Sequence, residues 1–196
     1  SWSNESGICL GCYIPQFIGP VKSGGWAKLM PNSLIVGEFT KETRPSDADT
    51  KFDKRMYASL FFDAANYGDK VPNEKWYGNN YSMDDLWEGN EGKMAGGAPS
   101  FNVNGTAGKF LIKKNTAYYV DDKAPDNMGN KEGRSSNLRV MRFAEVLLLY
   151  AEACAKTNDP DGANYALKQI RQRAGLTEKT FAQAELMNEI EHQCLL

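Results

Sequence analysis

The sequence predicts a mainly α-helical protein with long irregular loops and a few short strands. Apolar residues recur at helical spacing over residues 135–156, and a second amphipathic run covers residues 160–174. In residues 1–134, by contrast, glycine and proline separate short apolar segments. These observations divide the chain into a loop-rich subdomain, residues 1–134, and a tetratricopeptide-like helical segment, residues 135–196.

The first predicted helix, over residues 135–156, reads SSNLRVMRFAEVLLLYAEACAK. Its apolar positions lie close to 3.6 residues apart, as Val146 and Leu149 illustrate. Other apolar residues fill the remaining sides, which predicts a helix that is buried nearly all round. Small residues on one stripe predict that a neighbouring helix packs closely against it: Ala144, Ala151 and Ala155.

A second helix is predicted over residues 160–174, which would complete a hairpin. Asp159 is the expected N-cap, Pro160 the first helical residue and Gly175 the residue with positive φ after the end. The apolar stripe consists of Ala163, Ala166, Leu167, Ile170 and Ala174. The basic residues are expected to face water: Lys168, Arg171 and Arg173.

A third predicted helix follows and is expected to cover the hairpin. Thr180 and Gln183 have the spacing of a capping box. The face that would pack on the hairpin consists of Phe181, Ala184, Met187, Ile190 and Cys194. One such hairpin unit leaves a face uncovered, because repeat units of this kind bury their surfaces against neighbouring units.

The helical region resembles the C-terminal signature of the SusD/RagB family. The matching residues are the run Arg142–Glu145, the run Tyr150–Ala153, and Arg171-x-Arg173-Ala174-Gly175. The resemblance is specific between residues 137 and 176. A looser match precedes it at Phe52-Asp53-x-Arg55. Members of the family are much longer and begin with a lipoprotein signal peptide, so the chain is interpreted as a truncated C-terminal portion.

The resemblance implies a function. SusD/RagB proteins are glycan-binding lipoproteins of Bacteroidetes nutrient-uptake systems. By resemblance, the expected role is non-catalytic carbohydrate binding at the cell surface of the outer membrane, with oligosaccharide delivered to a SusC-like TonB-dependent transporter. Contact with the membrane would depend on a lipid anchor that this chain lacks. The alternative is a helical-repeat scaffold that binds another protein and no glycan.

The segment 76–87, WYGNNYSMDDLW, is the candidate ligand site. Sugars present apolar C–H faces, on which flat aromatic rings can lie, and hydroxyls, which amides and carboxylates can bind. The candidate ligand-binding residues are Trp76, Tyr77, Tyr81, Trp87, Asn80 and Asp84. The structural alternative is that Trp76 and Trp87 fix a long loop to the helical core of the protein.

Composition argues against several other classes of protein. A net charge of −2 gives no basic patch for nucleic acid. No apolar run is long enough to cross a membrane. Cys9 and Cys12 have the spacing of a zinc or redox pair, but Cys154 and Cys194 do not form a second pair, so structural thiols are favoured. No cofactor or metal is expected.

Catalysis is not expected. His192 is the one histidine in the sequence and lies near its end, which argues against Ser-His-Asp and Cys-His schemes. Asp84, Asp85 and Glu88 could be taken for a glycosidase pair, but such enzymes hold two carboxyls across a cleft. Adjacent acids are more typical of a turn or of the start of a helix, and they lack the spacing of an EF-hand.

The loop-rich subdomain contains a few weaker elements. Residues 34–36 predict a short strand or buried coil, and residues 42–51 a surface loop. Alternation over residues 56–62 favours a strand, although a helix over residues 53–65 competes with it. A further strand is expected over residues 109–113, after a glycine-rich loop at residues 89–108.

Overall fold

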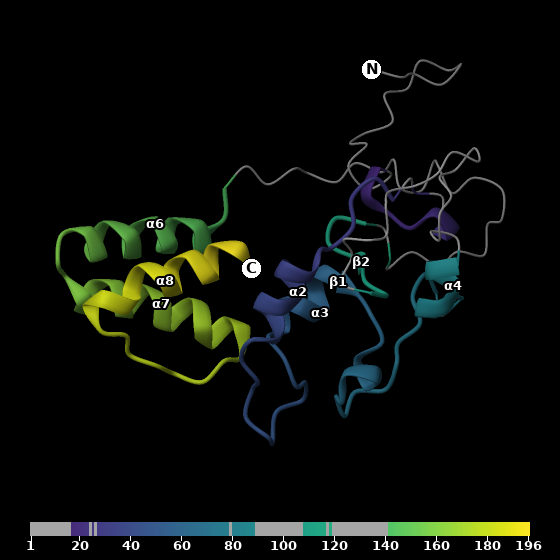
Figure 1. Ribbon diagram of the computed structural model, residues 1–196, viewed down its shortest axis with the longest axis horizontal. Helices are drawn as coiled ribbons and strands as arrows, with labels where there is room; N and C mark the ends of the chain where they lie inside the picture. Colours follow the sequence, from purple (N-terminus) through teal and green to yellow (C-terminus); the bar gives the residue numbers. More distant parts are fainter. Residues whose placement is uncertain are drawn as a thin grey trace, which may run out of the picture. The chain divides into compact units, whose positions relative to one another are not determined.

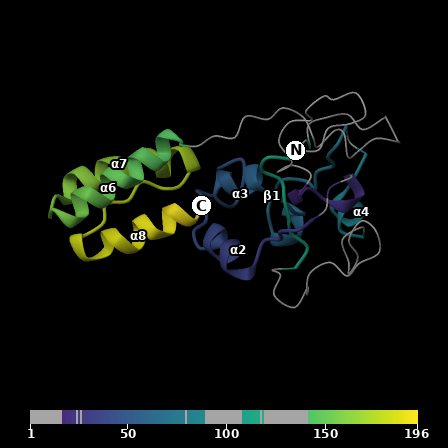
Figure 2. The same ribbon diagram turned by 90° about the horizontal axis from the view of Figure 1, so that it is seen from above.

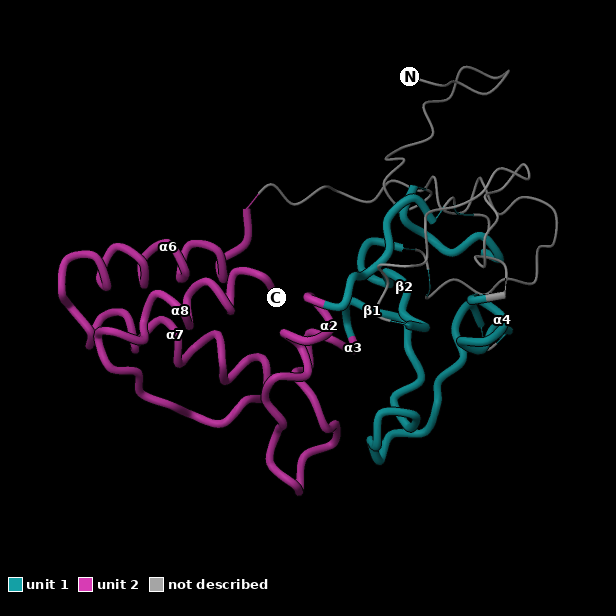
Figure 3. Tube along the Cα trace, viewed as in Figure 1, with its two compact units in different colours: residues 1–33, 58–138 teal, residues 34–57, 139–196 magenta. Residues whose placement is uncertain are grey.

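The computed structural model describes residues 17–23, 25, 27–78, 80–88, 108–116, 118 and 141–196. Within these residues it contains six α-helices, two 3₁₀ turns and one two-stranded antiparallel sheet (Figure 1). The predicted class, mainly α with few short strands, is confirmed. The chain forms two compact units (Figure 3). Residues 1–33 and 58–138 make the first unit, and residues 34–57 and 139–196 make the second.

Three helices dominate the second unit: α6 (Phe143–Lys156), α7 (Pro160–Ala174) and α8 (Gln183–Leu195). α6 and α7 form a hairpin, and α8 packs against both (Figure 1, Figure 2). Their shared core is rich in alanine, which lets the helix axes approach closely. It consists of Ala151, Cys154, Ala155, Ala163, Ala166, Leu167, Leu186 and Ile190.

The predicted ends of α7 are confirmed. Asp159 is the N-cap, and its carboxylate accepts a hydrogen bond from the Gly162 amide at 3.1 Å. Pro160 is the first helical residue, and Gly175 ends the helix with a φ of 74°. A side chain at Gly175 would also meet Arg44, because a Cβ there would lie 2.5 Å from Arg44 Nε.

Two expectations for α6 are wrong. The helix begins at Phe143, after Arg142 in an extended conformation, and the predicted residues 135–140 lie outside the described part of the chain. It is also not buried all round, because α7 and α8 cover one side only. Its other side exposes large apolar residues, which are Phe143, Val146, Leu149 and Tyr150.

The start of α8 differs from the predicted capping box. The N-cap is Ala182, and the Glu185 carboxylate accepts a hydrogen bond from its amide at 3.0 Å. The buried face is therefore shifted from the predicted one. Leu186, Ile190 and Gln193 are buried, whereas Ala184 and Cys194 are exposed.

The segment 34–57 clusters with the helices, although the sequence assigned it to the loop-rich subdomain. It contains most of α2 (Ser33–Thr40), where a strand or coil was expected over residues 34–36. The helix is favoured because Val36 and Phe39, three residues apart, are buried on one face. Residues 42–51 contain no helix or strand, as predicted.

The first unit contains the two strands, β1 (Leu60–Phe61) and β2 (Leu111–Ile112), with Leu60 opposite Ile112. The strand predicted within residues 109–113 is confirmed. The strand predicted over residues 56–62 is wrong for its first half, because α3 (Lys54–Ser59) occupies it. The first unit also contains three shorter elements: η1 (Val21–Ser23), η2 (Ala64–Tyr67) and α4 (Met83–Glu88).

Candidate functional site

The segment 76–87 is built into an aromatic core in the first unit. Phe61 is fully buried, and its ring centroid lies 5.0 Å from that of Trp76 in an edge-to-face arrangement. Tyr77 lies 6.1 Å from the same ring. The rest of this cluster consists of Met83, Leu86, Trp87 and Leu111. Pairs of rings in such geometries contribute about 0.5–1.5 kcal/mol beyond the burial of their area.

A tight loop joins Trp76 to Tyr81. The Trp76 amide donates to the Tyr81 carbonyl at 2.9 Å, and the Tyr81 amide donates back at 3.2 Å. Tyr77 has a φ of 56°, a left-handed conformation that is unusual for a bulky side chain. Two contacts hold it there: its amide donates to the Tyr118 carbonyl at 2.9 Å, and its own carbonyl accepts from Asn80 Nδ2 at 2.6 Å. Strain of this kind clusters at functional sites.

A reciprocal cap begins α4 directly after this loop. The Asp85 carboxylate accepts from the Ser82 hydroxyl at 2.6 Å and from the Ser82 amide at 2.8 Å. The Ser82 hydroxyl in turn accepts from the Asp85 amide at 3.2 Å. Hydrogen bonds from Ser82 hold the pKa of Asp85 below its usual value. Asp84 and Asp85 therefore stand at the start of a helix, as expected for adjacent acids.

The six predicted ligand-binding residues fall into two groups. The rings of Trp76, Tyr77 and Trp87 are packed in the core, with exposed fractions of 5%, 3% and 7%. Tyr81 is half-buried, whereas Asn80 and Asp84 are exposed. Asp84 forms an ion pair with Lys109 at 2.5 Å, on the surface. The structural alternative expected Trp76 and Trp87 on the helical core, whereas both rings pack in the aromatic core of the first unit.

Lys113 lies against the other side of this core. It is buried, and its ammonium lies 4.7 Å from the Tyr118 ring centroid and 5.9 Å from that of Trp76. Burial lowers its pKa, and the charge of Glu74, at 3.6 Å, opposes that shift. Glu74 also accepts from the Trp76 indole at 3.1 Å. The indole ring is thereby fixed in orientation as well as in position.

This arrangement suits a polar ligand better than an apolar one. Asn80 and Asp84 are exposed and Tyr81 is half-buried on a loop that packs on the aromatic core. Asn80 Nδ2 donates to the Tyr77 carbonyl and Asp84 pairs with Lys109, so a ligand would share these groups with the loop's own contacts. These are the groups that bind hydroxyls, and preformed positions reduce the entropy lost on binding.

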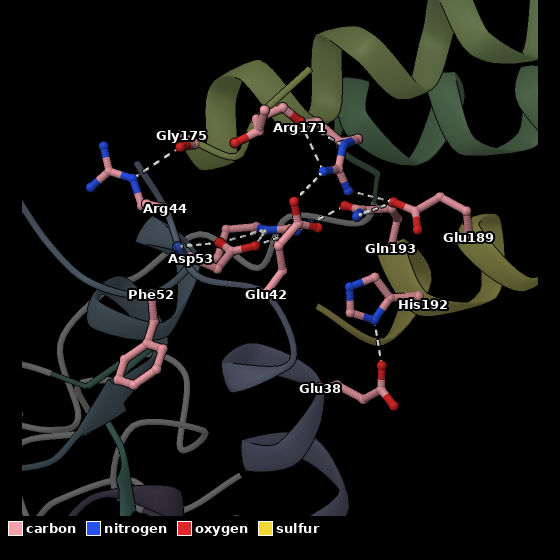
Figure 4. Close-up of polar contacts among 12 residues, drawn as sticks. Glu38, Glu42, Arg44, Phe52, Asp53, Arg171, Gly175, Glu189, His192 and Gln193 are labelled. Carbon is pink, nitrogen blue, oxygen red and sulfur yellow. Dashed lines mark hydrogen bonds and ion pairs between the residues drawn. The ribbon is translucent and has the colours of Figure 1, made fainter. Parts of the chain in front are cut away.

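A second polar constellation lies in the other unit and centres on Arg171 of α7 (Figure 4). Its side chain is 0% exposed. It donates to Glu42 at 2.7 Å, to Glu189 at 2.8 Å, and twice to the Thr177 carbonyl. Buried guanidinium groups require such complete pairing, because an unpaired buried charge is very costly. The expectation that Arg171 faces water is wrong.

Further contacts around Arg171 join the segment 34–57 to the helices of this unit (Figure 4). Arg44 Nε donates to the Gly175 carbonyl at 3.0 Å, and the buried His192 pairs with Glu38. Arg55 bridges Asp53, at 2.6 Å, and Gln193, at 2.8 Å. The contacts that tie this segment to the helices are thus largely hydrogen bonds and ion pairs.

Two carboxylates of this network, Glu38 and Glu42, have lowered pKa values. A hydrogen bond from His192 lowers the pKa of Glu38. Burial raises the pKa of Glu42, but hydrogen bonds from Arg171 and Lys179 outweigh it, so the net pKa lies below the usual value. Burial lowers the pKa of Arg171. The hydrogen bonds from its side chain to Glu42 and Glu189 raise it by more, so the net pKa lies above the usual value. Glu38, Glu42 and Arg171 are therefore charged near neutral pH.

The described residues contain no group of three His, Cys, Asp or Glu side chains placed to hold a metal ion. Among the helices of the described part of the chain, none is both long and apolar enough for a membrane span. Cys154 is buried and Cys194 exposed, both as free thiols, and Cys9 and Cys12 lie outside the described residues.

Comparison with known proteins decides the family. The model of the SusD family matches residues 1–196, the whole chain. The chain belongs to the SusD family. A search of curated proteins gives no match.

Solved structures show the same fold. The chain superposes on a SusD superfamily protein from Bacteroides vulgatus with a TM-score of 0.64 and 22% identity, covering 92% of this chain and 33% of that one. A SusD-like protein from Bacteroides fragilis gives a TM-score of 0.56 and 22% identity, covering 97% of this chain and 37% of that one. The chain thus spans about a third of the length of these SusD proteins.

Two residues of the run that resembles the SusD signature, Arg171 and Gly175, take part in the Arg171 network. Arg171 is its centre, Gly175 accepts from Arg44, and the looser Asp53-x-Arg55 match supplies the bridge to Gln193. The sequence identifies these residues by their resemblance to the family, but it does not reveal that together they connect the segment 34–57 to the helices. One signal was available: Arg171 stands four residues after Leu167, on the buried stripe.

Proposed function

We propose that this chain is part of a protein that binds glycans at the cell surface without catalysis and delivers oligosaccharide to a TonB-dependent outer-membrane transporter. The observation that carries the proposal is the SusD family match over all 196 residues.

Within this proposal, the loop at residues 76–87 contributes to the glycan site. Asn80 and Asp84 would bind sugar hydroxyls, and the half-buried Tyr81 would offer its ring edge and phenol. Trp76, Tyr77 and Trp87 remain predicted ligand residues, and their burial gives them the additional role of holding the loop in place.

Affinity electrophoresis against a panel of polysaccharides tests the proposal. We expect retardation by at least one glycan, and we expect Tyr81→Ala and the pair Asn80→Ala with Asp84→Ala to weaken it about tenfold, which corresponds to about 1.4 kcal/mol. Asn188→Ala, an exposed amide on α8, is the matched control and should bind as the wild type does.

The choice of variants matters because Trp76 is buried. Loss of binding in Trp76→Ala or Asn80→Ala would not separate a ligand contact from a collapsed loop, because Trp76 belongs to the aromatic core and Asn80 Nδ2 donates to the Tyr77 carbonyl. These variants are informative only when the urea midpoint of the first unit, followed by tryptophan fluorescence, equals that of the wild type. If folded protein binds no glycan in the panel but captures a loop of the transporter, the helical-scaffold alternative is favoured instead.

A further inference from the structure

Besides the core around Phe61, the first unit contains a group of packed rings that reaches the surface. Phe62 and Phe110 are buried, and their rings are stacked with centroids 5.6 Å apart. Tyr67 packs on both, at 5.1 Å from Phe110 and 6.2 Å from Phe62, yet 36% of its surface remains exposed. The two phenylalanines therefore support an aromatic ring that solvent can reach.

A short turn holds the Tyr67 ring in position. Tyr67 is the last residue of η2, and Gly68 ends this turn with a φ of 72°. The Gly68 amide donates to the Ala65 carbonyl at 3.1 Å, and the Asp69 amide donates to the Ala64 carbonyl at 3.2 Å. A ring that is held in this way loses little entropy when a ligand binds to it.

Charged side chains connect this ring to the predicted ligand loop. A Cβ on Gly108 would lie 3.9 Å from the Tyr67 hydroxyl, and the next residue, Lys109, pairs with Asp84 at 2.5 Å. Asp63 is the N-cap of η2, the turn that carries Tyr67. Asp84, a predicted ligand-binding residue, therefore lies in the same part of the surface as Asp63 and Tyr67.

The electrostatics of this surface disfavour anions. Burial and the charge of Asp84 raise the pKa of Asp63, and the opposing effect of Lys109 is smaller. Burial and the charge of Asp63 also raise the pKa of Tyr67. Both shifts disfavour the anionic form of the side chain, and a carboxylate brought here by a ligand would meet the same loss of solvation and the same negative charge.

We propose that the glycan site continues from Asp84 onto the exposed Tyr67 ring, and that this part of the site binds an uncharged sugar and disfavours a uronate. The ring offers an apolar surface to the C–H face of a sugar. The Asp63 carboxylate can accept hydrogen bonds from sugar hydroxyls, whereas a uronate carboxylate would be repelled by it. The inference rests on the proposed glycan binding and adds the charge class of the sugar.

Affinity electrophoresis of the full-length protein tests the inference with matched pairs of polymers. Amylopectin, laminarin, xyloglucan and galactomannan are each compared with a form oxidised at C6 to the uronate. We expect at least one neutral polymer to retard the wild type, and its oxidised form to do so at least about fivefold less. Tyr67→Ala should weaken retardation by the neutral polymer about tenfold, whereas Tyr67→Phe, which keeps the ring, should weaken it less than about threefold.

A second variant tests the charge while the ring stays in place. Asp63→Asn replaces a carboxylate by an amide of similar shape, so it should increase retardation by the oxidised polymer about threefold and change retardation by the neutral polymer less than about twofold. Asp161→Asn, which neutralises an exposed acid in the first turn of α7, is the matched control and should change neither.

The possible outcomes separate the inference from the proposed function. If Tyr67→Ala keeps the wild-type urea midpoint, followed by tryptophan fluorescence, and also keeps wild-type binding, the inference fails alone. Equal retardation by the neutral and oxidised polymers, or equal responses of Asp63→Asn and Asp161→Asn, would also refute it. If Tyr67→Ala lowers the midpoint, the Asp63→Asn comparison decides. A wild type that no polymer retards would contradict the proposed function and the inference together.

Discussion

The two units of this protein are stabilised by different side chains. In the second unit, alanines let three helices approach, and the fully buried Arg171 joins them to the segment 34–57. In the first unit, short elements surround a cluster of large rings around Phe61. Helices satisfy their own backbone hydrogen bonds and need small residues to pack closely. The described part of the first unit contains little regular structure, and the large apolar area of each ring stabilises it instead.

The difference also bears on the proposed ligand-binding loop at residues 76–87. Loops that carry function are usually held by a rigid scaffold. In the first unit the scaffold is the aromatic core itself, which is why Trp76 and Trp87 are buried beneath the polar residues that the loop exposes.

The largest effect on stability is expected from a substitution that breaks the charge network around Arg171. Arg171→Ala leaves Glu42 and Glu189 without their buried partner and should lower the free energy of unfolding by about 3–5 kcal/mol. Urea unfolding followed by far-UV circular dichroism, which reports mainly on the helices, measures it. Arg173→Ala removes an exposed arginine from the same helix and should change stability by no more than about 0.5 kcal/mol. Equal effects in the two variants would contradict the central place of Arg171.

A comparable loss is expected in the first unit from Phe61→Ala, because the variant leaves a cavity at the centre of the ring cluster. The expected cost is about 3–5 kcal/mol. All four tryptophans of the sequence fall within the residues of the first unit, so their fluorescence reports on that unit alone. Tyr165→Ala, an exposed ring on α7, is the control. A fluorescence transition that does not move in Phe61→Ala would contradict the role assigned to this core.

A smaller effect tests the close packing of the helices. A Cβ on Gly162 would lie 2.7 Å from Cys154 Sγ and 2.5 Å from a carboxylate oxygen of Asp159. Gly162→Ala should therefore cost about 1–3 kcal/mol, as overpacking does. Gly37→Ala is the matched control, since a Cβ there meets nothing within 4 Å. Chemical denaturation of both variants checks the prediction, and a stabilised Gly162→Ala would refute it.

The smallest effect concerns pH. The lowered pKa values of Glu38 and Glu42 mean that each carboxylate adds stability above its ordinary pKa of 4.5 and loses it as the pH falls through the lower value in the folded state. The contribution of these two carboxylates to the free energy of unfolding, measured on the helical transition, should thus be constant between about pH 7 and pH 5 and decrease below about pH 4.5. Glu42→Gln should flatten this decline, and an unchanged pH profile in that variant would contradict the assignment.

Local patterns in the sequence were sufficient for part of the fold. The ends of α7 follow from Asp159, Pro160 and Gly175, because caps depend on the conformation of a few adjacent residues. The buried stripe of that helix was likewise readable from its period, and the family signature was readable from the runs around Arg142 and Arg171. Each of these features depends on residues that are close together in the sequence.

Tertiary structure alone decided the rest. The burial of Arg171 depends on Glu42, 129 residues earlier, which no local pattern connects to α7. The same holds for Trp76 and Trp87, whose rings are buried because Phe61 and Leu111 pack with them in one cluster. Spacing along a chain identifies the apolar faces of a helix, but only the neighbours brought by the fold determine which of those faces are covered. Helix α6 is the example in this protein, because it is apolar on both sides and, among the described residues, packs against α7 and α8 on one side.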